Sequence, residues 1–309
     1  MSDSPSPIES IRHAESQLRF IKPEALIAIR NLSLVAKAVV EGFISGMHRS
    51  PYHGFSVDFA EYRSYAPGDD IRSVDWKVYA RSDKFFVKKF EGDTNTQIYL
   101  LLDCSKSMGF SSHGISKLDY GRFLAASLAY MCQRQKDAVG LMTFDKKILD
   151  YTPARVRRGQ LHTLLHHLDR AENGEQTDIA AAVTELANYT RKRNLLVLIS
   201  DFYQDPEAVA KALRLFHFRG NDLVIFHLLD PIELDPPFQG TVTLEDVETG
   251  EHLTFNSDSR KQYLARLEEH IAQLRKSFSE MNVDYEVLNT ERPLDAALRR
   301  YLTARSKQH

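Results

Sequence analysis

The 309-residue chain contains only two cysteines and one tryptophan, and neither sign of charge dominates it. Two cysteines, Cys104 and Cys132, cannot build a disulfide framework, so a reducing compartment suits the chain. Lys and Arg number 40 against 42 Asp and Glu, a formal net charge of -2. Because clustered positive charge supplies most of the affinity for nucleic acid, this balance argues against a nucleic-acid partner.

The chain also lacks a stretch with the composition of a membrane span or a secretory signal. Residues 1–20 are polar and interrupted by charges such as Asp3 and Arg12, so they lack the apolar core of a signal peptide. The most apolar long stretch, Ala25–Phe43, carries Arg30 and Lys37, which excludes it as a span. We therefore expect no direct membrane span and a cytoplasmic location.

From residue 96 onward, apolar runs of strand length alternate with helical patterns. The strand-like runs are Ile98–Leu102, Ala138–Phe144, Leu195–Ile199, Leu223–Leu229 and Val283–Leu288. The helical patterns are Lys117–Gln135, Gly159–Ala171, Ile179–Arg191, Pro206–Phe218, Ser259–Met281 and Pro293–Ala304. Such alternation is typical of βαβ units, so we predict an α/β fold with a doubly wound, mostly parallel, Rossmann-like sheet. Gln239–Phe255 reads as an inserted hairpin.

The chain before residue 96 divides into two further parts. After Pro23, apolar residues recur every three or four positions over Leu26–Phe43, which predicts one amphipathic helix. In residues 48–92, short apolar pieces mix with charged and aromatic residues, and a strand is expected around Val87. We predict an N-terminal tail and helix at residues 1–47, a small β-rich module at 48–95 and the α/β domain at 96–309.

Small oxygen-bearing side chains follow two of the predicted strands. Asp103, Ser105 and Ser107 alternate directly after the first strand, and Asp201 follows the third. Ligands of open parallel sheets bind beyond the carboxyl ends of the strands, where the strand order reverses. These four residues are therefore expected to converge at one edge of the sheet.

A polar loop between those strands ends at Thr177 and Asp178, and either side chain is available as a further donor. Hydroxyl and carboxylate oxygens without His or Cys favour a hard ion, so we expect Mg²⁺, with Mn²⁺ or Ca²⁺ as substitutes. The competing interpretation is helix capping, in which Asp103, Ser105 and Asp201 satisfy the first amides of following helices. For all of these residues together, metal binding is favoured.

The pattern Asp103-x-Ser105-x-Ser107, followed by Thr177 and Asp201, resembles the metal-ion-dependent adhesion site of von Willebrand factor A domains. The resemblance implies that the hydroxyls of Ser105, Ser107 and Thr177 ligate the ion. It implies that Asp103 and Asp201 act directly or through water. One coordination position then stays open for an acidic side chain of a partner protein.

The upstream residues resemble a bacterial family known as "domain of unknown function 58". The matching residues are Gly54-x-x-x-Asp58-Phe59, Arg63-x-Tyr65-x-x-Gly68-Asp69-Asp70-x-Arg72-x-x-Asp75-Trp76, Ala80-Arg81 and Val87-Lys88-x-Phe90-Glu91. Members join this module to a von Willebrand A-like domain and often accompany a MoxR-type AAA+ ATPase, which the resemblance implies as a partner. Many relatives carry amino-terminal membrane spans, and this chain departs from them in that respect.

The charged residues of the upstream module have two interpretations. Asp58, Arg63, Asp69, Arg72, Asp75 and Arg81 form either a structural lattice of ion pairs or a partner-docking surface. Buried ion pairs are often structural and leave stability nearly unchanged, and the structural interpretation is favoured.

The combined features predict a non-enzymatic, Mg²⁺-dependent adaptor that binds acidic side chains of a protein partner, an ATPase or its client. The alternative is a Mg²⁺-dependent phosphohydrolase with Asp103 as nucleophile. That chemistry usually requires a second carboxylate two residues later, and Ser105 stands there. The chain also lacks the Gly-rich phosphate cradle of nucleotide hydrolases and the GxSxG elbow of serine hydrolases.

Overall fold

The computed structural model describes residues 21–29, 31–47, 61–64, 86–89, 97–190, 193–237, 242–245, 252–255 and 257–306. The chain divides into two compact units, one formed by Ser50–Asn95 and the other by Met1–Arg49 with Thr96–His309. In the smaller unit, β1 (Glu61–Ser64) pairs antiparallel with β2 (Phe86–Lys89). The strand expected around Val87 is thus confirmed.

The larger unit is built on a six-stranded sheet with the order β10-β7-β6-β3-β4-β5. Its strands are β3 (Gln97–Asp103), β4 (Ala138–Phe144), β5 (Ile148–Arg155), β6 (Asn194–Ser200), β7 (Asp222–Leu229) and β10 (Asp284–Asn289). All neighbouring pairs are parallel except β4 and β5. The sequence predicted every strand but β5, which lies at the sheet edge, where Pro153 is tolerated.

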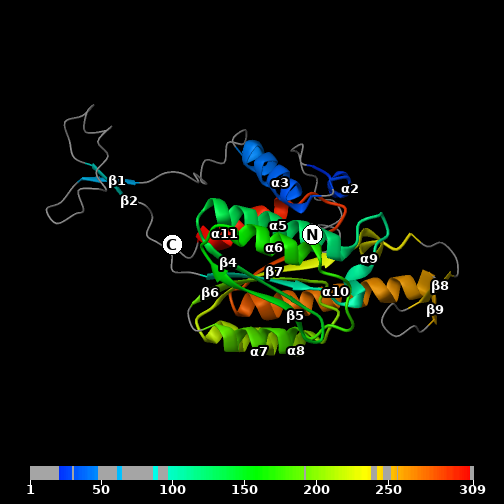
Figure 1. Cartoon of the computed structure of the whole chain (residues 1–309). Coiled ribbons are helices and arrows are strands. Elements are labelled where there is room, and N and C mark those ends of the chain that lie inside the picture. The colour runs from blue at the N-terminus through cyan, green and yellow to red at the C-terminus, as the bar shows by residue number, and fades with distance from the viewer. Residues whose placement is uncertain are drawn as a thin grey trace, which may run out of the picture. The chain divides into compact units, whose positions relative to one another are not determined.

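Helices cover both faces of this sheet (Figure 1). One layer consists of α5 (Lys117–Arg134), α6 (Gln160–Asp169) and α11 (Asp295–Ser306), and the other of α7 (Ile179–Tyr189), α8 (Pro206–Phe218) and α10 (Ser257–Glu280). Side chains alternate along each strand, so Leu100 and Leu102 enter one core and Tyr99 and Leu101 the other. The predicted doubly wound α/β class is therefore confirmed.

The amino-terminal segment forms two helices, so the prediction of one continuous helix was wrong. The first is α2 (Pro23–Ile27), and the second is α3 (Leu32–Met47). Asn31 separates them because its Oδ1 accepts the amide of Ser33 at 2.9 Å, which starts a new helix. Helix α3 buries its apolar side, including Phe43, in the same core as α5 and α6. It adds a second helical layer on that face of the sheet (Figure 1).

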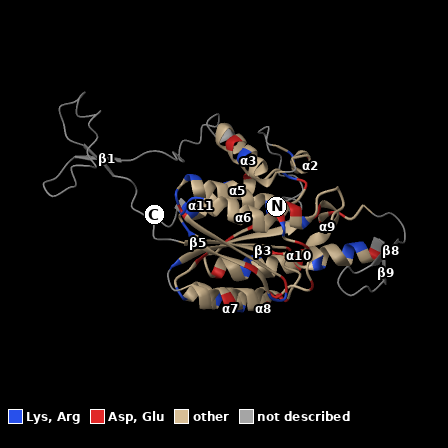
Figure 2. Ribbon diagram, viewed as in Figure 1, with Lys and Arg blue, Asp and Glu red and all other residues tan. Residues whose placement is uncertain are grey.

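Few charged residues lie along the central strands of the larger unit (Figure 2). The central strands are mostly uncharged, whereas charged residues lie on the helices and in the loops at the strand ends. The hairpin predicted within Gln239–Phe255 is present as antiparallel β8 (Val242–Glu245) and β9 (His252–Phe255). None of the described helices is long and apolar enough to cross a bilayer.

Candidate metal site

The strand order reverses beside β3, the first strand of the sheet in the chain. From β3 the chain first builds β4 on one side and later returns to build β6 on the other. The order therefore reverses between β3 and β6, which is where open α/β sheets bind ligands. Asp103 ends β3, and Asp201 directly follows β6, so the predicted acids stand at the carboxyl ends of the two neighbouring strands at this reversal.

Both carboxylate oxygens of Asp103 accept hydrogen bonds, and the side chain is completely buried. Oδ1 accepts the Ser105 amide at 2.8 Å. Oδ2 accepts the hydroxyl of Ser200 at 2.6 Å and that of Thr177 at 2.9 Å. Asp103 thus joins the end of β6 and the loop before α7 to its own strand.

The two serines after Asp103 form the next part of the cluster. The Ser105 and Ser107 hydroxyls lie 3.2 Å apart, on a loop that turns into the short 3-10 helix η2 (Lys106–Gly109). Ser105 occupies the N-cap position of η2, yet its side chain makes no capping hydrogen bond. Its hydroxyl is therefore directed to the cluster and not to a helix terminus.

Thr177 and Asp178 have separate roles. Asp178 is the N-cap of α7, and its Oδ1 accepts the Ala181 amide at 2.8 Å. Thr177 instead donates its hydroxyl to Asp103. Of the two side chains, only Thr177 therefore contacts Asp103 in the described structure.

Asp201 also takes no part in helix capping, because the N-cap of the following helix α8 is Asp205. The side chain of Asp201 is fully buried, and its Oδ2 lies 2.8 Å from the Nζ of Lys117. Its Oδ1 is buried without a hydrogen-bond partner. A buried carboxylate oxygen without a hydrogen-bond donor destabilises the fold, so a cation or a further donor at this position would stabilise it.

Lys117 was not predicted from the sequence as part of the site. It is the first residue of α5, its side chain is 1% exposed, and it bonds both Asp201 and Glu233. Burial lowers its pKa, but the two carboxylates together raise the pKa above the ordinary lysine value. Lys117 is therefore a permanently charged ammonium next to the cluster.

The loop that carries Thr177 fits closely against the end of β4. Asp145, which follows β4, accepts the amides of Lys147 and Glu175 through its side chain. A Cβ atom on Gly174 would come within 2.3 Å of Asp145 Oδ2, so only glycine fits there. Asp145 and Gly174 were also missed by the sequence analysis. Their close contact fixes the position of the loop that carries Thr177 relative to the end of β4.

The electrostatics of the cluster favour an added cation. Burial and the charge of Asp201 raise the pKa of Asp103 to about 6, although its hydrogen bonds with Ser200 and Ser105 oppose the rise. A divalent ion between the two acids would reverse this effect by stabilising both carboxylates. The donor set, three hydroxyls and two carboxylates, fits a hard cation such as Mg²⁺. Within the described part of the chain, no three His, Cys, Asp or Glu side chains form a metal-binding group, so any ion site here depends on hydroxyls.

The other sequence-predicted residues add little to this geometry. Arg63 lies on β1, where its backbone pairs with Val87. Asp58, Asp69, Arg72, Asp75 and Arg81 lie outside the described residues. Cys104 is buried next to Asp103, and burial raises the pKa of its thiol to about 12, which makes it unreactive.

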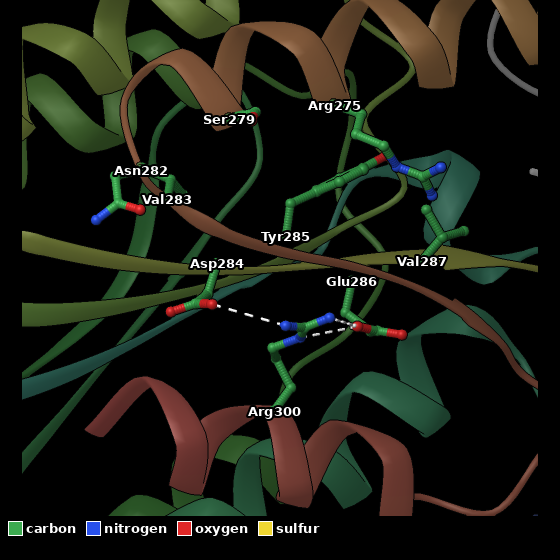
Figure 3. A pocket seen from close by; sticks show the side chains of 9 residues that line it. All are labelled: Arg275, Ser279, Asn282, Val283, Asp284, Tyr285, Glu286, Val287 and Arg300. Atoms are coloured by element: carbon green, nitrogen blue, oxygen red, sulfur yellow. Dashed lines mark hydrogen bonds and ion pairs between the residues drawn. The ribbon is translucent and has the colours of Figure 1, made fainter. Parts of the chain in front are cut away.

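A hollow of about 370 Å³ lies elsewhere, at the beginning of β10 between α10 and α11 (Figure 3). Its charged lining is partly self-neutralised, because Arg300 donates to Glu286 at 2.6 and 2.8 Å. None of the five clustered residues lines it. The hollow and the Asp103 cluster are therefore separate features of the fold.

A family model described as "Protein of unknown function DUF58" matches residues 61–275, a stretch that includes the whole Asp103 cluster. The chain belongs to this DUF58 family. The resemblance to the family known as "domain of unknown function 58" is therefore confirmed.

The matches to relatives of this DUF58 chain range from nearly its whole length to about a quarter of it. The uncharacterized protein Mb1516 of Mycobacterium bovis is 28% identical, with the match covering 99% of this chain and 98% of that protein. The uncharacterized protein YeaD of Bacillus subtilis is 36% identical over 70 residues, which is 23% of this chain and 17% of YeaD.

Two solved structures align with part of this chain. The conserved hypothetical protein BatB from Bacteroides thetaiotaomicron matches 68% of this chain and 99% of its own at 12% identity and a TM-score of 0.48. The SpRpn10 VWA domain matches 66% of this chain and 93% of its own at 13% identity and a TM-score of 0.39.

Proposed function

We propose that this DUF58 protein is a non-enzymatic adaptor that binds an acidic side chain of a partner protein through a Mg²⁺ ion. The observation that carries the proposal is the convergence of Asp103, Ser105, Ser107, Thr177 and Asp201 at the reversal point of the sheet. The unpartnered buried oxygen of Asp201 supports it, because an ion or its water would satisfy that atom.

In this proposal the hydroxyls of Ser105, Ser107 and Thr177 hold the ion, and Asp103 and Asp201 act directly or through water. The bound ion supplies a concentrated positive charge with a position open to another anionic oxygen. Three hydroxyls and two carboxylates fill at most five positions of an octahedral Mg²⁺ ion, so one position stays open to a further oxygen ligand. A Glu or Asp of a partner is the natural additional ligand.

We further propose that the partner is a MoxR-type AAA+ ATPase or a client of that ATPase. This part of the proposal follows from the family resemblance. The charged residues of the Ser50–Asn95 unit, Arg63 among them, are the candidate second contact surface, and a cytoplasmic location fits such a partner.

The geometry favours the adaptor over a phosphohydrolase. A nucleophilic Asp103 would need a free oxygen and a neighbouring acid–base group. Both of its oxygens accept hydrogen bonds, and the residue two positions later is Ser105. A generic phosphatase substrate hydrolysed at a rate that Asp103→Asn abolishes would reverse this preference.

The adaptor is tested by its affinity for the MoxR-type ATPase of the same host, measured on immobilised ATPase. Because the ATPase itself uses Mg²⁺, site variants in constant Mg²⁺ are more informative than chelator alone. Thr177→Val and Asp201→Asn each remove one desolvated contact to the ion, worth about 2–5 kcal/mol, so affinity should fall at least about thirtyfold.

The matched control is Thr184→Val, because Thr184 is exposed on α7 and donates only to Ala180 of its own helix. It should leave the affinity unchanged. Equal affinities of the wild type, Thr177→Val and Asp201→Asn would overturn the proposed metal-dependent binding.

A further inference from the structure

Lys117 is held beside the candidate ion site by three separate contacts. Its Nζ lies 2.8 Å from Asp201 Oδ2 and 2.7 Å from Glu233 Oε1. It also lies 4.8 Å from the ring centroid of Tyr203, which covers the ammonium. With a side chain 1% exposed, this charge acts on its neighbours with little screening by water.

The acidic side chains near Lys117 already accept hydrogen bonds from other groups, with one exception. Asp230 accepts the Ser112 hydroxyl and the amides of Ser112 and Ile232. Glu233 accepts the Asp230 amide at 2.7 Å through Oε2 and Lys117 through Oε1. Asp201 is the exception, because neither of its oxygens accepts a hydrogen bond and Oδ1 also lacks an ion-pair partner. The ion pair with Lys117 thus engages Oδ2 and leaves Oδ1 available.

We infer that Lys117 is a positioning residue that sets the charge balance of the ion site. Its positive charge opposes the binding of the ion and favours an anionic ligand on the bound ion. Glu233 has the opposite effect, because its negative charge offsets that of Lys117. This inference rests on the proposed function, since it concerns the same ion.

The charge argument gives a pattern of opposite signs. Lys117→Met removes a positive charge near the site, so the ion should bind more tightly and a carboxylate ligand on the ion more weakly. Glu233→Gln removes a negative charge and should do the reverse. Each affinity should change by about tenfold, because the charges are buried and close. A purely structural role for Lys117 would instead weaken both affinities together.

Glu233→Gln also protects the test against a folding failure. Lys117→Met leaves Asp201 and Glu233 buried without their shared cation, which strongly destabilises a fold. Glu233→Gln keeps the Lys117–Asp201 pair and an amide oxygen in place of the carboxylate. Lys146→Met is the matched control, because Lys146 pairs with Glu175 at the surface of the same loop region, where water screens both charges.

The experiment measures Mn²⁺ binding to the full chain from the electron paramagnetic resonance signal of the free ion. Acetate is then added to the Mn²⁺-loaded protein, and its binding is followed from the loss of water-proton relaxation. The expected result is tighter Mn²⁺ and weaker acetate for Lys117→Met, the reverse for Glu233→Gln, and no change for Lys146→Met.

Two other results would overturn the inference and are distinguishable. If the wild type binds Mn²⁺ but Glu233→Gln changes neither affinity, or changes both in the same direction, Lys117 and Glu233 do not set the charge balance. If the wild type binds no Mn²⁺ at all, the proposed metal-dependent function fails, and this inference fails with it.

Discussion

The side-chain amide of Gln204 binds the backbone of the Thr177 loop through both its nitrogen and its oxygen. Its Nε2 donates to the Thr177 carbonyl at 2.6 Å, and its Oε1 accepts the Ile179 amide at 3.1 Å. Gln204 follows β6, whereas Thr177 precedes α7, so the contact joins the loop after β6 to the loop before α7. The position of the Thr177 hydroxyl therefore depends on a residue outside the proposed ligand set.

Gln204→Leu should weaken Mg²⁺ binding about tenfold, since it releases the loop and leaves the Thr177 carbonyl without its donor. A lost hydrogen bond of this kind costs about 1–3 kcal/mol when the remaining group is buried. The measurement is calorimetric titration with Mg²⁺. Gln273→Leu, on the exposed side of α10, is the control and should bind like the wild type. Unchanged affinity in Gln204→Leu would show that the loop does not need this contact.

Gly174→Ala should also weaken Mg²⁺ binding, but through backbone displacement. The added Cβ would meet Asp145 Oδ2 at 2.3 Å, so either the loop or Asp145 must move. A loss of about threefold to tenfold in affinity is expected, because Thr177 shifts with the loop. Gly42→Ala on α3 is the control, since nothing lies within 4 Å of its Cβ. Wild-type affinity in Gly174→Ala would contradict the close fit.

Asp103→Asn should stabilise the metal-free protein while abolishing its stabilisation by Mg²⁺. In the metal-free fold the pKa of Asp103 is raised to about 6, so its charge costs stability at pH 7 and this cost disappears as pH falls below that value. Removing the charge should therefore add about 1–3 kcal/mol to the free energy of unfolding at pH 7 in chelator. Urea unfolding with chelator and with Mg²⁺ measures both effects. A metal-free variant less stable than the wild type would refute this view of Asp103.

His227 should make the fold sensitive to acid. It is fully buried in β7, where Nδ1 lies 2.7 Å from the Tyr285 hydroxyl, and its ring packs against Phe202 and His270. Burial, with the nearby His270 and Lys117, lowers its pKa to about 3. Because the unfolded chain takes up the proton near pH 6.5, the contribution of His227 to stability should be constant above that pH and fall below it. The loss is at most about 1.4 kcal/mol per pH unit, continuing towards pH 3.

The contribution of His227 is isolated by urea unfolding of the wild type and His227→Asn at pH 7.5 and 5.5 in chelator. Asn keeps a polar group near Tyr285 but does not titrate. The stability difference between the two proteins should shrink by about 1 kcal/mol between these pH values. A difference that is the same at both would show that His227 does not carry this acid sensitivity.

Strands β3, β4, β6 and β7 could be predicted from the sequence because each is almost fully buried and reads as a mostly apolar run. Strand β5 was missed since it is half exposed and contains Asp150 and Pro153, which weaken any strand pattern. The break before α3 was missed because the apolar period continues through it. Only the capping bonds of Asn31 reveal that the helix starts again there.

The site residues that directly follow strands could be predicted from the sequence. Those that reach the site only through contacts between distant parts of the chain could not. Asp103 and Asp201 are adjacent to apolar runs that locate them at one sheet edge. Lys117 opens an amphipathic helix and reads as a solvated lysine, because its partners Asp201 and Glu233 are far away in the sequence. Gln204 has no sequence signal at all, since its role comes from two loops that approach each other only in the folded chain.

The central claim is that Asp103, Ser105, Ser107, Thr177 and Asp201 form one divalent-ion site, and calorimetric titration of Mg²⁺ into the metal-free full chain tests it most directly. The account predicts one site per chain in the wild type and in Thr184→Val. It predicts no detectable binding in Asp103→Asn and clearly weaker binding in Thr177→Val. Wild-type affinity in Asp103→Asn, or no Mg²⁺ binding by the wild type, would contradict it.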